Sequence, residues 1–292
     1  MNRREFLSTT GAAALTLPFL SGAKVAFAQP ASGDAALNAV FERIFQEQVR
    51  TSPTTATFLG LDKGELAPLR SQLDTRPVAQ ARREEAARTD KFIGWLEAIP
   101  EAGLSGTGKL NREVILWDLR TSNVGPKRFD ISNPQSPYEV SQQDGIYFSR
   151  PDFLHSAHPV ETASDAEAYL SRLTQFATEL DNETVEVRRQ AARGFLAPGW
   201  SLDLALKQMK ELRSPAPEQS PMADSVASRA AAKNIPGDWR GRAAKIIADQ
   251  VNPADRRILS SSALISATCC RPIWWISSAE KLVVVASASA AA

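Results

Sequence analysis

Residues 164–181 read SDAEAYLSRLTQFATELD, and this stretch decides the fold class. Its large apolar residues recur every three or four positions, as Tyr169, Leu170, Leu173, Phe176 and Leu180. That spacing places one apolar stripe along one face of an α-helix. Ser164 and Glu167 form a capping-box pattern, which predicts that the helix begins there and runs to about Asp181. A further helix is expected from Asn182 to about Gly194.

The same pattern recurs on both sides of this stretch and predicts more amphipathic helices. Their expected ranges are about 37–45, 53–60, 77–99, 109–120, 201–212 and 238–247. The helix over 109–120 is expected to bury Leu110, Val114 and Trp117 on one side. Ser201 and Asp238 are expected to cap the last two helices, and Asn252-Pro253 is expected to end the final stripe.

Residues 123–159 interrupt the helical pattern. The segment holds five prolines and two glycines among several aromatic side chains. We expect an irregular loop rich in aromatic residues and proline, or a short hairpin around Gln143-Asp144-Gly145, because Asp-Gly is a turn signal. Long structured loops of this kind are often functional. The chain is therefore predicted to be mainly α, a helical bundle-like array with one irregular segment.

The N-terminus carries the pattern of an export signal. Arg3 and Arg4 form a twin-arginine pair, an apolar stretch follows over residues 11–20, and Ala26-Phe27-Ala28 is a small-x-small cleavage site. This order is typical of a leader that is removed during twin-arginine export. The apolar stretch is well short of the roughly 20 residues that a membrane span requires. We therefore expect cleavage after Ala28, the twin-arginine export machinery as a partner, and a periplasmic or secreted protein.

The balance of charges limits the classes of binding partner that the protein is expected to have. The chain has 34 Lys and Arg residues against 33 Asp and Glu residues. The leader contains three of the basic residues and one of the acidic residues, so the mature protein carries a net charge of −1. Such a balance gives no electrostatic footprint for nucleic acid or an anionic membrane. We expect no nucleic-acid partner and no stable membrane span after cleavage.

No catalytic motif is found in the predicted helices. The sequence has no G-x-S-x-G elbow, H-E-x-x-H pair, phosphate-binding glycine loop or C-x-x-C pair. The spacing of His155 and His158 could chelate a metal on a helix, but zinc needs a third ligand and Pro159 follows directly. Ordinary hydrogen bonds of loop histidines are the alternative. Cys269 and Cys270 are adjacent, so they imply neither a disulfide framework nor a metal site.

Several blocks of sequence nevertheless resemble one bacterial family. The longest is SPYEVSQQDGIYFS over 136–149, followed by PDFL over 151–154 and His158-Pro159. Supporting blocks are SPTTATFLG over 52–60, DAEAYL over 165–170, ALKQMK over 205–210 and IPGDW over 235–239. In this order they resemble the N-terminal half of the bacterial domain-of-unknown-function 885 family, over about residues 35–254.

The resemblance implies an exported, mostly helical protein that is much longer than this chain. Members resemble zinc metallopeptidases through a His-Glu…Gly-His motif with a downstream acidic ligand in the C-terminal half. That motif has no counterpart here, so no catalytic residue or metal ligand carries over, no cofactor is expected in this chain, and zinc is expected for full-length relatives alone. In such a relative the loop over 136–148 would line the substrate cleft, with Gln142, Gln143 and Tyr147 as polar contacts to a peptide substrate. The alternative is that the loop packs helices together.

From about Asp255 the sequence changes character. Residues 255–292 show no helical period and no capping signal, and they hold a run of Ser and Ala, both cysteines and the pair Trp274-Trp275. We expect a disordered or ill-defined tail in place of the metal-binding half, with a translated frameshift as its origin. A natural C-terminal extension is the alternative. The expected organisation is a leader over 1–28, a helical region over 29–254 and this anomalous tail.

Two functions are compatible with these features. The first is the N-terminal part of an exported metallopeptidase-like hydrolase that is inactive alone because the metal-binding half is missing. The second is a stand-alone helical binding or interaction module of the periplasm. The first predicts no stoichiometric zinc, no peptidase activity and exposed apolar helix faces that the missing half would cover. A soluble monomer that melts cooperatively would favour the second.

Overall fold

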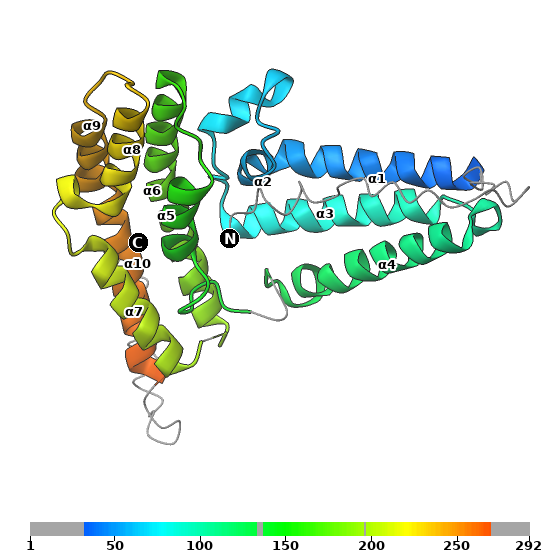
Figure 1. Ribbon diagram of the computed structural model, residues 1–292. Helices are drawn as coiled ribbons and strands as arrows, with labels where there is room; N and C mark the ends of the chain where they lie inside the picture. The colour runs from blue at the N-terminus through cyan, green and yellow to red at the C-terminus, as the bar shows by residue number, and fades with distance from the viewer. Residues whose placement is uncertain (1–31, 133–136, 196, 270–292) are drawn as a thin grey trace, which may run out of the picture.

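The computed structural model describes residues 32–132, 137–195 and 197–269. Within these ranges every regular element is helical, which confirms the prediction of a mainly α fold. The helices form two parts (Figure 1). An upright bundle contains α5 to α10, and an arm made of α1, α3 and α4 extends from its side.

The arm and its connections come first in the chain. The elements are α1 (Ser32–Thr51), α2 (Pro53–Phe58), η1 (Gly64–Ser71), α3 (Val78–Glu97), η2 (Glu101–Gly103) and α4 (Gly106–Ser122). The side chain of Ser52 accepts the backbone N–H of Thr55 and caps α2, with Pro53 at the first helical position. Gly60 follows α2 with a φ of 68°, a conformation that glycine adopts without strain.

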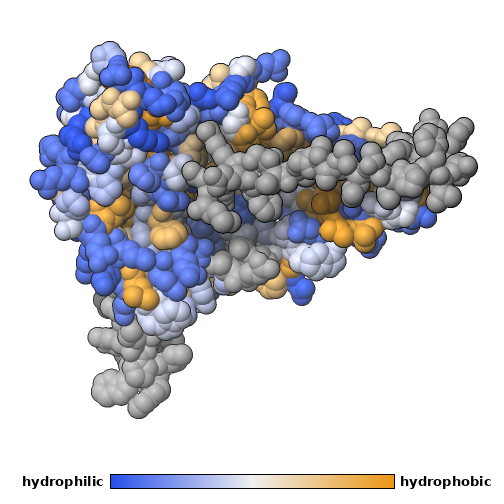
Figure 2. Space-filling view, viewed as in Figure 1, coloured by the Kyte–Doolittle hydropathy of each residue, from blue (hydrophilic) through white to orange (hydrophobic). Residues whose placement is uncertain are grey.

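The core of the arm lies between its three long helices. It is formed by Leu37, Ile44, Phe92, Leu96, Leu104, Leu116 and Leu119. The predicted face of α4 is therefore wrong: Leu110, Val114 and Trp117 are 63%, 52% and 66% exposed. Both faces of α4 carry apolar residues, and the period alone cannot decide which one packs against α3. The outcome leaves an apolar stripe on the outside of the arm, and Figure 2 shows hydrophobic residues gathered along its lower edge, over α4.

The bundle is built around one long helix. Its elements are α5 (Ile146–Ser156), α6 (Ala163–Ala192), α7 (Gly199–Arg213), η4 (Pro217–Gln219), α8 (Pro221–Ala232), α9 (Trp239–Ile246), η5 (Ile247–Val251) and α10 (Asn252–Cys269), while η3 (Gly125–Phe129) follows α4 and packs against α3 and α4. The predicted stripe of α6 is buried in the core of the bundle, and Tyr169, Leu173, Phe176 and Leu180 have no exposed surface. The bundle therefore forms around the stretch that predicted the fold class.

Two expectations for α6 are wrong. It is one continuous helix rather than two, since Asn182 stays helical and donates its side-chain amide to the carbonyls of Thr75 and Arg76. Its capping box pairs Thr162 with Asp165, not Ser164 with Glu167. The two candidate boxes overlap in sequence, and a tertiary contact favours the first, because the Asp165 carboxylate also accepts from Arg70 at 2.7 Å.

The irregular segment is partly helical. No strand occurs in the described part of residues 123–159, so the alternative of a short hairpin around Gln143-Asp144-Gly145 is excluded. Residues 141–145 form a turn in which the Ser141 hydroxyl accepts the backbone N–H groups of Gln143 and Asp144. Gly145 has a φ of 129° and leads directly into α5.

The end of the helical region also differs from expectation. Asn252-Pro253 does not end the structure, because η5 runs directly into α10, where Ala254 and Ile258 are buried and the helix contacts α6 and α7. Asp238 caps α9 as predicted, through the N–H of Gly241. Ser201 lies inside the first turn of α7 instead of capping it, since Pro198 holds the cap position. None of the described helices is long and apolar enough to cross a membrane.

Two predicted features cannot be located in the fold. The leader, with Arg3, Arg4, Ala26 and Ala28, and residues 270–292 lie outside the described residues.

Candidate functional site: a buried charged network

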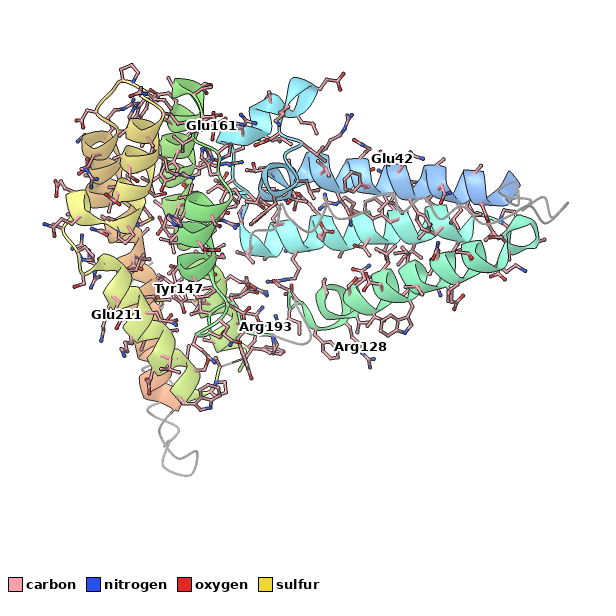
Figure 3. The ribbon with its side chains drawn as sticks, viewed as in Figure 1. Glu42, Arg128, Tyr147, Glu161, Arg193 and Glu211 are labelled. Carbon is pink, nitrogen blue, oxygen red and sulfur yellow. The ribbon has the colours of Figure 1, made fainter. Side chains whose placement is uncertain are left out.

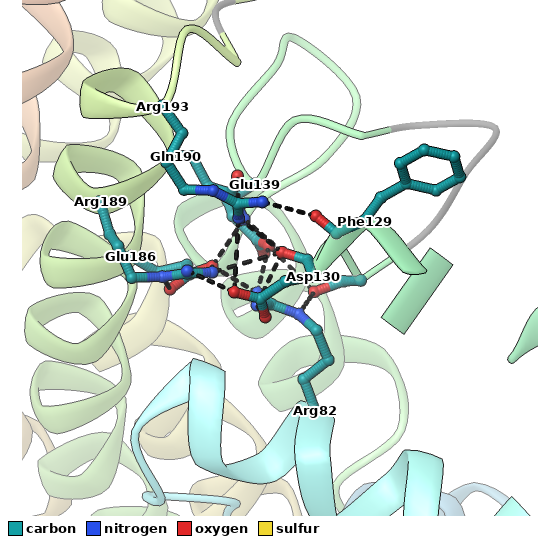
Figure 4. A network of polar contacts seen from close by, with 9 residues as sticks. Arg82, Phe129, Asp130, Glu139, Glu186, Arg189, Gln190 and Arg193 are labelled. Atoms are coloured by element: carbon teal, nitrogen blue, oxygen red, sulfur yellow. Dashed lines mark hydrogen bonds and ion pairs between the residues drawn. The ribbon is translucent and has the colours of Figure 1, made fainter. Parts of the chain in front are cut away.

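A network of charged side chains joins the arm to the bundle (Figure 4). It lies where α3, the segment after η3 and the C-terminal part of α6 meet. We call this set the junction network. Its members are Arg82, Asp130, Glu139, Glu186, Arg189, Gln190 and Arg193.

Arg82 is the centre of the junction network. Its side chain is 3% exposed and reaches from α3 to three carboxylates. The guanidinium donates to Asp130 Oδ1 at 2.8 Å, to Glu139 Oε1 at 3.0 Å and to Glu186. A guanidinium presents several donors in a fixed plane, so one arginine can hold partners from three segments. Arg82 therefore fixes the position of α3 against α6.

Asp130 connects the other side of the network. Its backbone is left-handed, with a φ of 52°, which Asp tolerates better than most residues. This conformation follows the π-type turn of η3 and lets both its carbonyl and its carboxylate face α6. Arg189 donates to its carboxylate at 2.5 Å, and Gln190 and Arg193 donate to its carbonyl at 3.1 and 3.0 Å.

The charges within the junction network offset one another. Burial opposes ionisation of Glu186, but hydrogen bonds from Arg189 and Arg82 outweigh it and lower the pKa of this carboxyl. Burial also opposes ionisation of Asp130, but hydrogen bonds from Arg82 and Arg189 outweigh it and lower the pKa of this carboxyl. Burial raises the pKa of Glu139. The carboxylates accept from arginines, so the network is suited to positioning helices rather than to reacting with a substrate.

Two further glutamates on α6 hold α5. Glu179 accepts from Arg150 at 2.6 and 2.8 Å, and Glu183 accepts the backbone N–H of Ile146 at 2.9 and 3.1 Å. Ile146 is the first residue of α5, so the Glu183 side chain satisfies an otherwise open donor of that helix. Burial raises the pKa of Glu183 to about 8.

The three predicted substrate contacts, Gln142, Gln143 and Tyr147, differ in burial and in hydrogen bonding. Tyr147 is buried, and its hydroxyl lies 2.7 Å from both the Ser141 carbonyl and Gln208 Oε1, so it bridges to α7. Burial raises its pKa to about 12. Gln142 accepts a hydrogen bond from the Ser201 hydroxyl. Gln143 is exposed. Figure 3 shows Tyr147 within the bundle and Arg193 on the side toward the arm.

A second buried network, which the sequence did not reveal, surrounds Arg172 on α6. This side chain is wholly buried and donates to Thr57 Oγ1 at 2.6 Å and to the Leu69 carbonyl at 3.0 Å. It also contacts His158 Nδ1 at 2.7 Å. Burial lowers the pKa of Arg172 to about 10. An arginine within the apolar stripe of residues 164–181 is the one signal that could have indicated a buried charge.

His158 takes part in this second network as a neutral ring. Its Nε2 lies 2.9 Å from the Asp165 carbonyl, which can accept but not donate, so Nε2 carries the hydrogen and Nδ1 accepts from Arg172. Burial, with the nearby Arg172 charge, lowers its pKa to about 4. His155 lies 3.3 Å from the Ser225 hydroxyl. The two histidines therefore make ordinary hydrogen bonds in this fold, although His155 lies in the last turn of α5 and not in the expected loop.

The zinc that the resemblance implies for longer relatives does not fit the described residues. No group of three or more His, Cys, Asp and Glu side chains among them is arranged to hold a metal ion. Both ring nitrogens of His158 already have partners, and the carboxylates of the junction network accept from arginines. Zinc stays a prediction for the longer relatives.

The fold and the junction network together define an all-helical protein whose two parts are joined by buried ion pairs. The family described as "Bacterial protein of unknown function (DUF885)" matches residues 53–261. This chain belongs to that family, which confirms the predicted resemblance. The match ends somewhat later than the expected residue 254 and includes the first half of α10.

One solved structure with the same fold is described as "The crystal structure of the putative lipoprotein from Colwellia psychrerythraea". The two chains are 19% identical, with a TM-score of 0.70 over 81% of this chain. At this identity the similarity shows the fold alone. The aligned part covers 42% of the relative, so this chain spans less than half of its length. No curated protein matches the chain.

Proposed function

We propose that this chain is the N-terminal helical part of an exported metallopeptidase-like protein and that it does not hydrolyse peptides by itself. The observation that supports this proposal is that the buried carboxylates of α6 already have hydrogen-bond partners. Glu179 and Glu186 accept from arginines, and Glu183 accepts the N–H of Ile146. None of the three is placed to hold a zinc ion together with a histidine or to activate a bound water. They hold helices in position for chemistry elsewhere.

The length of the solved relative supports this proposal. This chain covers 42% of that protein, so a longer protein with the same helical region has room for a second part. The relative is described as a "putative lipoprotein", and this description supports export, as does the twin-arginine leader predicted for this chain. Export to the periplasm or outside the cell belongs to the same proposal.

The family match ends at residue 261, within α10. A change of reading frame after that residue, later than the expected codon 254, belongs to the same proposal. Sequencing the gene beyond codon 254 tests this point. A His-Glu…Gly-His continuation in another frame would support the frameshift, and its absence from every frame would refute it.

The lack of activity is tested on the mature chain, residues 29–292. Zinc is measured by plasma mass spectrometry after purification without chelators, and hydrolysis is measured with a library of quenched fluorescent peptides. We expect neither stoichiometric zinc nor hydrolysis above the blank. A longer family member, purified and assayed in the same way, is the control. One zinc ion per chain together with peptide hydrolysis would contradict the proposal.

A stand-alone binding module is the second candidate, and the loop over 137–145 favours it. Gln143 is exposed on this loop, while Gln142 and Tyr147 anchor the loop to α7. An exposed polar side chain on an anchored loop is a common arrangement for binding. If the chain binds peptides alone, calorimetric titration with the same peptide library gives saturable heats, which are lost in Gln143→Ala and kept in Gln219→Ala.

A further inference from the structure

Glu183 is a buried carboxyl group without an ion-pair partner. It lies on α6, and 4% of its surface is exposed. Both of its carboxyl oxygens accept from a single donor, the backbone N–H of Ile146, at 2.9 and 3.1 Å. Within the described residues, no basic side chain forms an ion pair with it. An ionised carboxylate offers about four acceptor sites, so one shared donor replaces a small part of the hydration that the charge loses on burial.

Two other glutamates use the positive charge near Glu183. Glu179, one turn earlier on α6, accepts from Arg150 at both oxygens. Glu139 accepts from Arg82 in the junction network (Figure 4). Because both arginines are already engaged, ionised Glu183 adds a negative charge beside two others without a cation of its own. Burial, together with these two carboxylates, raises the pKa of Glu183 to about 8, against its one hydrogen bond and the attraction of Arg150.

The groups that act on Glu183 from the surrounding segments include no free cation among the described residues. They are Arg150 and Tyr147 on α5, Glu139 in the loop over 137–145, and Glu179 on α6. Tyr147 stays a neutral phenol, since burial raises its pKa to about 12, and Asp144 adds a carboxylate near it. From α3, Arg82 donates to carboxylates of the junction network. Arg82 and Arg150 are therefore both bound to other acids.

We propose that Glu183 is a proton switch for the loop over 137–145. In the folded protein it holds a proton at neutral pH, and its ionisation loosens the loop and the start of α5. The helix α6 belongs to the core of the bundle, whereas the loop is exposed at Gln143 and Asp144. Repulsion between ionised Glu183 and Glu139 is therefore relieved by movement of the loop that carries Glu139, and not by movement of α6.

The direction of the switch follows from the two states of the Glu183 carboxyl group. When it is protonated, one oxygen can still accept the Ile146 N–H, and no added charge faces Glu139. A carboxyl group with a raised pKa in the closed arrangement favours that arrangement at low pH. This contribution is complete below the ordinary value of 4.5 and is lost as the pH rises through about 8. The loop is thus held in neutral solution and loosened in mildly alkaline solution.

A fluorescent label on the loop tests the switch in the mature chain. The labelled chain carries Gln143→Cys with Cys269→Ser and Cys270→Ser, and the anisotropy of a dye at position 143 is followed from about pH 6 to about pH 10. We expect the anisotropy to fall in one transition near pH 8. Glu183→Gln keeps the shape of the side chain but cannot ionise, so its anisotropy is expected to stay high throughout. Glu113→Gln, at an exposed position on α4, is the matched control and should keep the transition.

Infrared spectroscopy detects the proton itself. Both chains in this comparison carry Asp255→Asn, because Asp255 is also a buried carboxyl group. At about pH 7.5 we expect the carbonyl band of a protonated carboxyl group, which is lost at about pH 9.5 and reduced by one group in Glu183→Gln. Equal bands with and without Glu183→Gln, a parent chain without a loop transition, or a transition that persists in Glu183→Gln would each overturn the proposal. Neither measurement uses peptide or zinc, so the result is independent of the function proposed above.

Discussion

Asp255 is a buried carboxylate without a hydrogen bond. It is 1% exposed, and neither side-chain oxygen has a partner. Burial raises its pKa to about 6, against the attraction of Arg213 and Arg256. The unfolded chain keeps the ordinary value near 3.8. Since the folded-state pKa is the higher one, the folded protein is favoured at low pH, and that stability is lost as the pH rises through about 6.

Asp255→Asn is therefore expected to stabilise the protein at neutral pH. The pKa difference corresponds to roughly 3 kcal/mol of destabilisation by the ionised carboxylate. The amide that replaces it is also buried at some cost, so we expect the free energy of unfolding to increase by about 2 kcal/mol at pH 7.5. The gain should disappear below about pH 4. Urea denaturation between pH 4 and 8 measures it. Asp249→Asn, at an exposed pair with Lys245, is the control and should change stability by less than about 0.5 kcal/mol. Equal pH dependence in the parent chain and Asp255→Asn would contradict this account.

At the scale of the element, the start of α6 depends on one hydroxyl. The Thr162 side chain accepts the N–H of Asp165, and the Asp165 carboxylate returns a bond to the Thr162 N–H at 3.0 Å. Thr162→Ala removes the first of these and is expected to lower the free energy of unfolding by about 1 kcal/mol. Ser164→Ala, which removes the hydroxyl of the predicted cap, is expected to be neutral. Urea denaturation compares the two. A loss at Ser164 as large as that at Thr162 would show that the cap is assigned incorrectly.

The helices were predictable from the apolar period, while their boundaries and faces were less so. The stripe of residues 164–181 and the cap at Asp238 are local features, and the structure contains both. The face of α4 and the start of α6 depend on contacts made by distant segments, such as Arg70 with Asp165. Pattern alone carries no information about those contacts. The same holds for α10, whose irregular sequence is helical where it packs against α6 and α7.

The candidate site was the least predictable part. Gln142 and Tyr147 belong to a recognisable loop, but the sequence could not show that one accepts from Ser201 and that the other is buried. The junction network was missed because its members are dispersed over more than a hundred residues of sequence. Arg82 resembled a residue on a solvated helix face beside Arg83 and Glu84. Its burial follows from the fold and not from its neighbours in sequence.

At the scale of the whole molecule, the arm and the bundle have separate apolar cores joined by the junction network. Arg82→Leu leaves Glu186 buried without its α3 partner, so we expect a loss of about 3–5 kcal/mol. Hydrogen exchange of α3 is expected to accelerate in this variant before that of the α6 core. Arg83→Leu, at an exposed neighbouring position, is the control and should lie within about 0.5 kcal/mol of the parent chain. Similar effects of the two substitutions would refute the central role of Arg82.

Because α6 is continuous, the number of its residues between two contacts is constrained. Arg70 and Arg82, only one short segment apart, attach to Asp165 and Glu186 near opposite ends of the same helix. The helix thus sets both the distance and the angle between Asp165 and Glu186. Inserting or deleting one residue between them would turn Glu186 by about 100° relative to Asp165 and move it away from Arg82. A one-residue insertion in α6 is therefore expected to break the contact between α3 and α6, whereas exposed side chains of α6 can be exchanged without this effect.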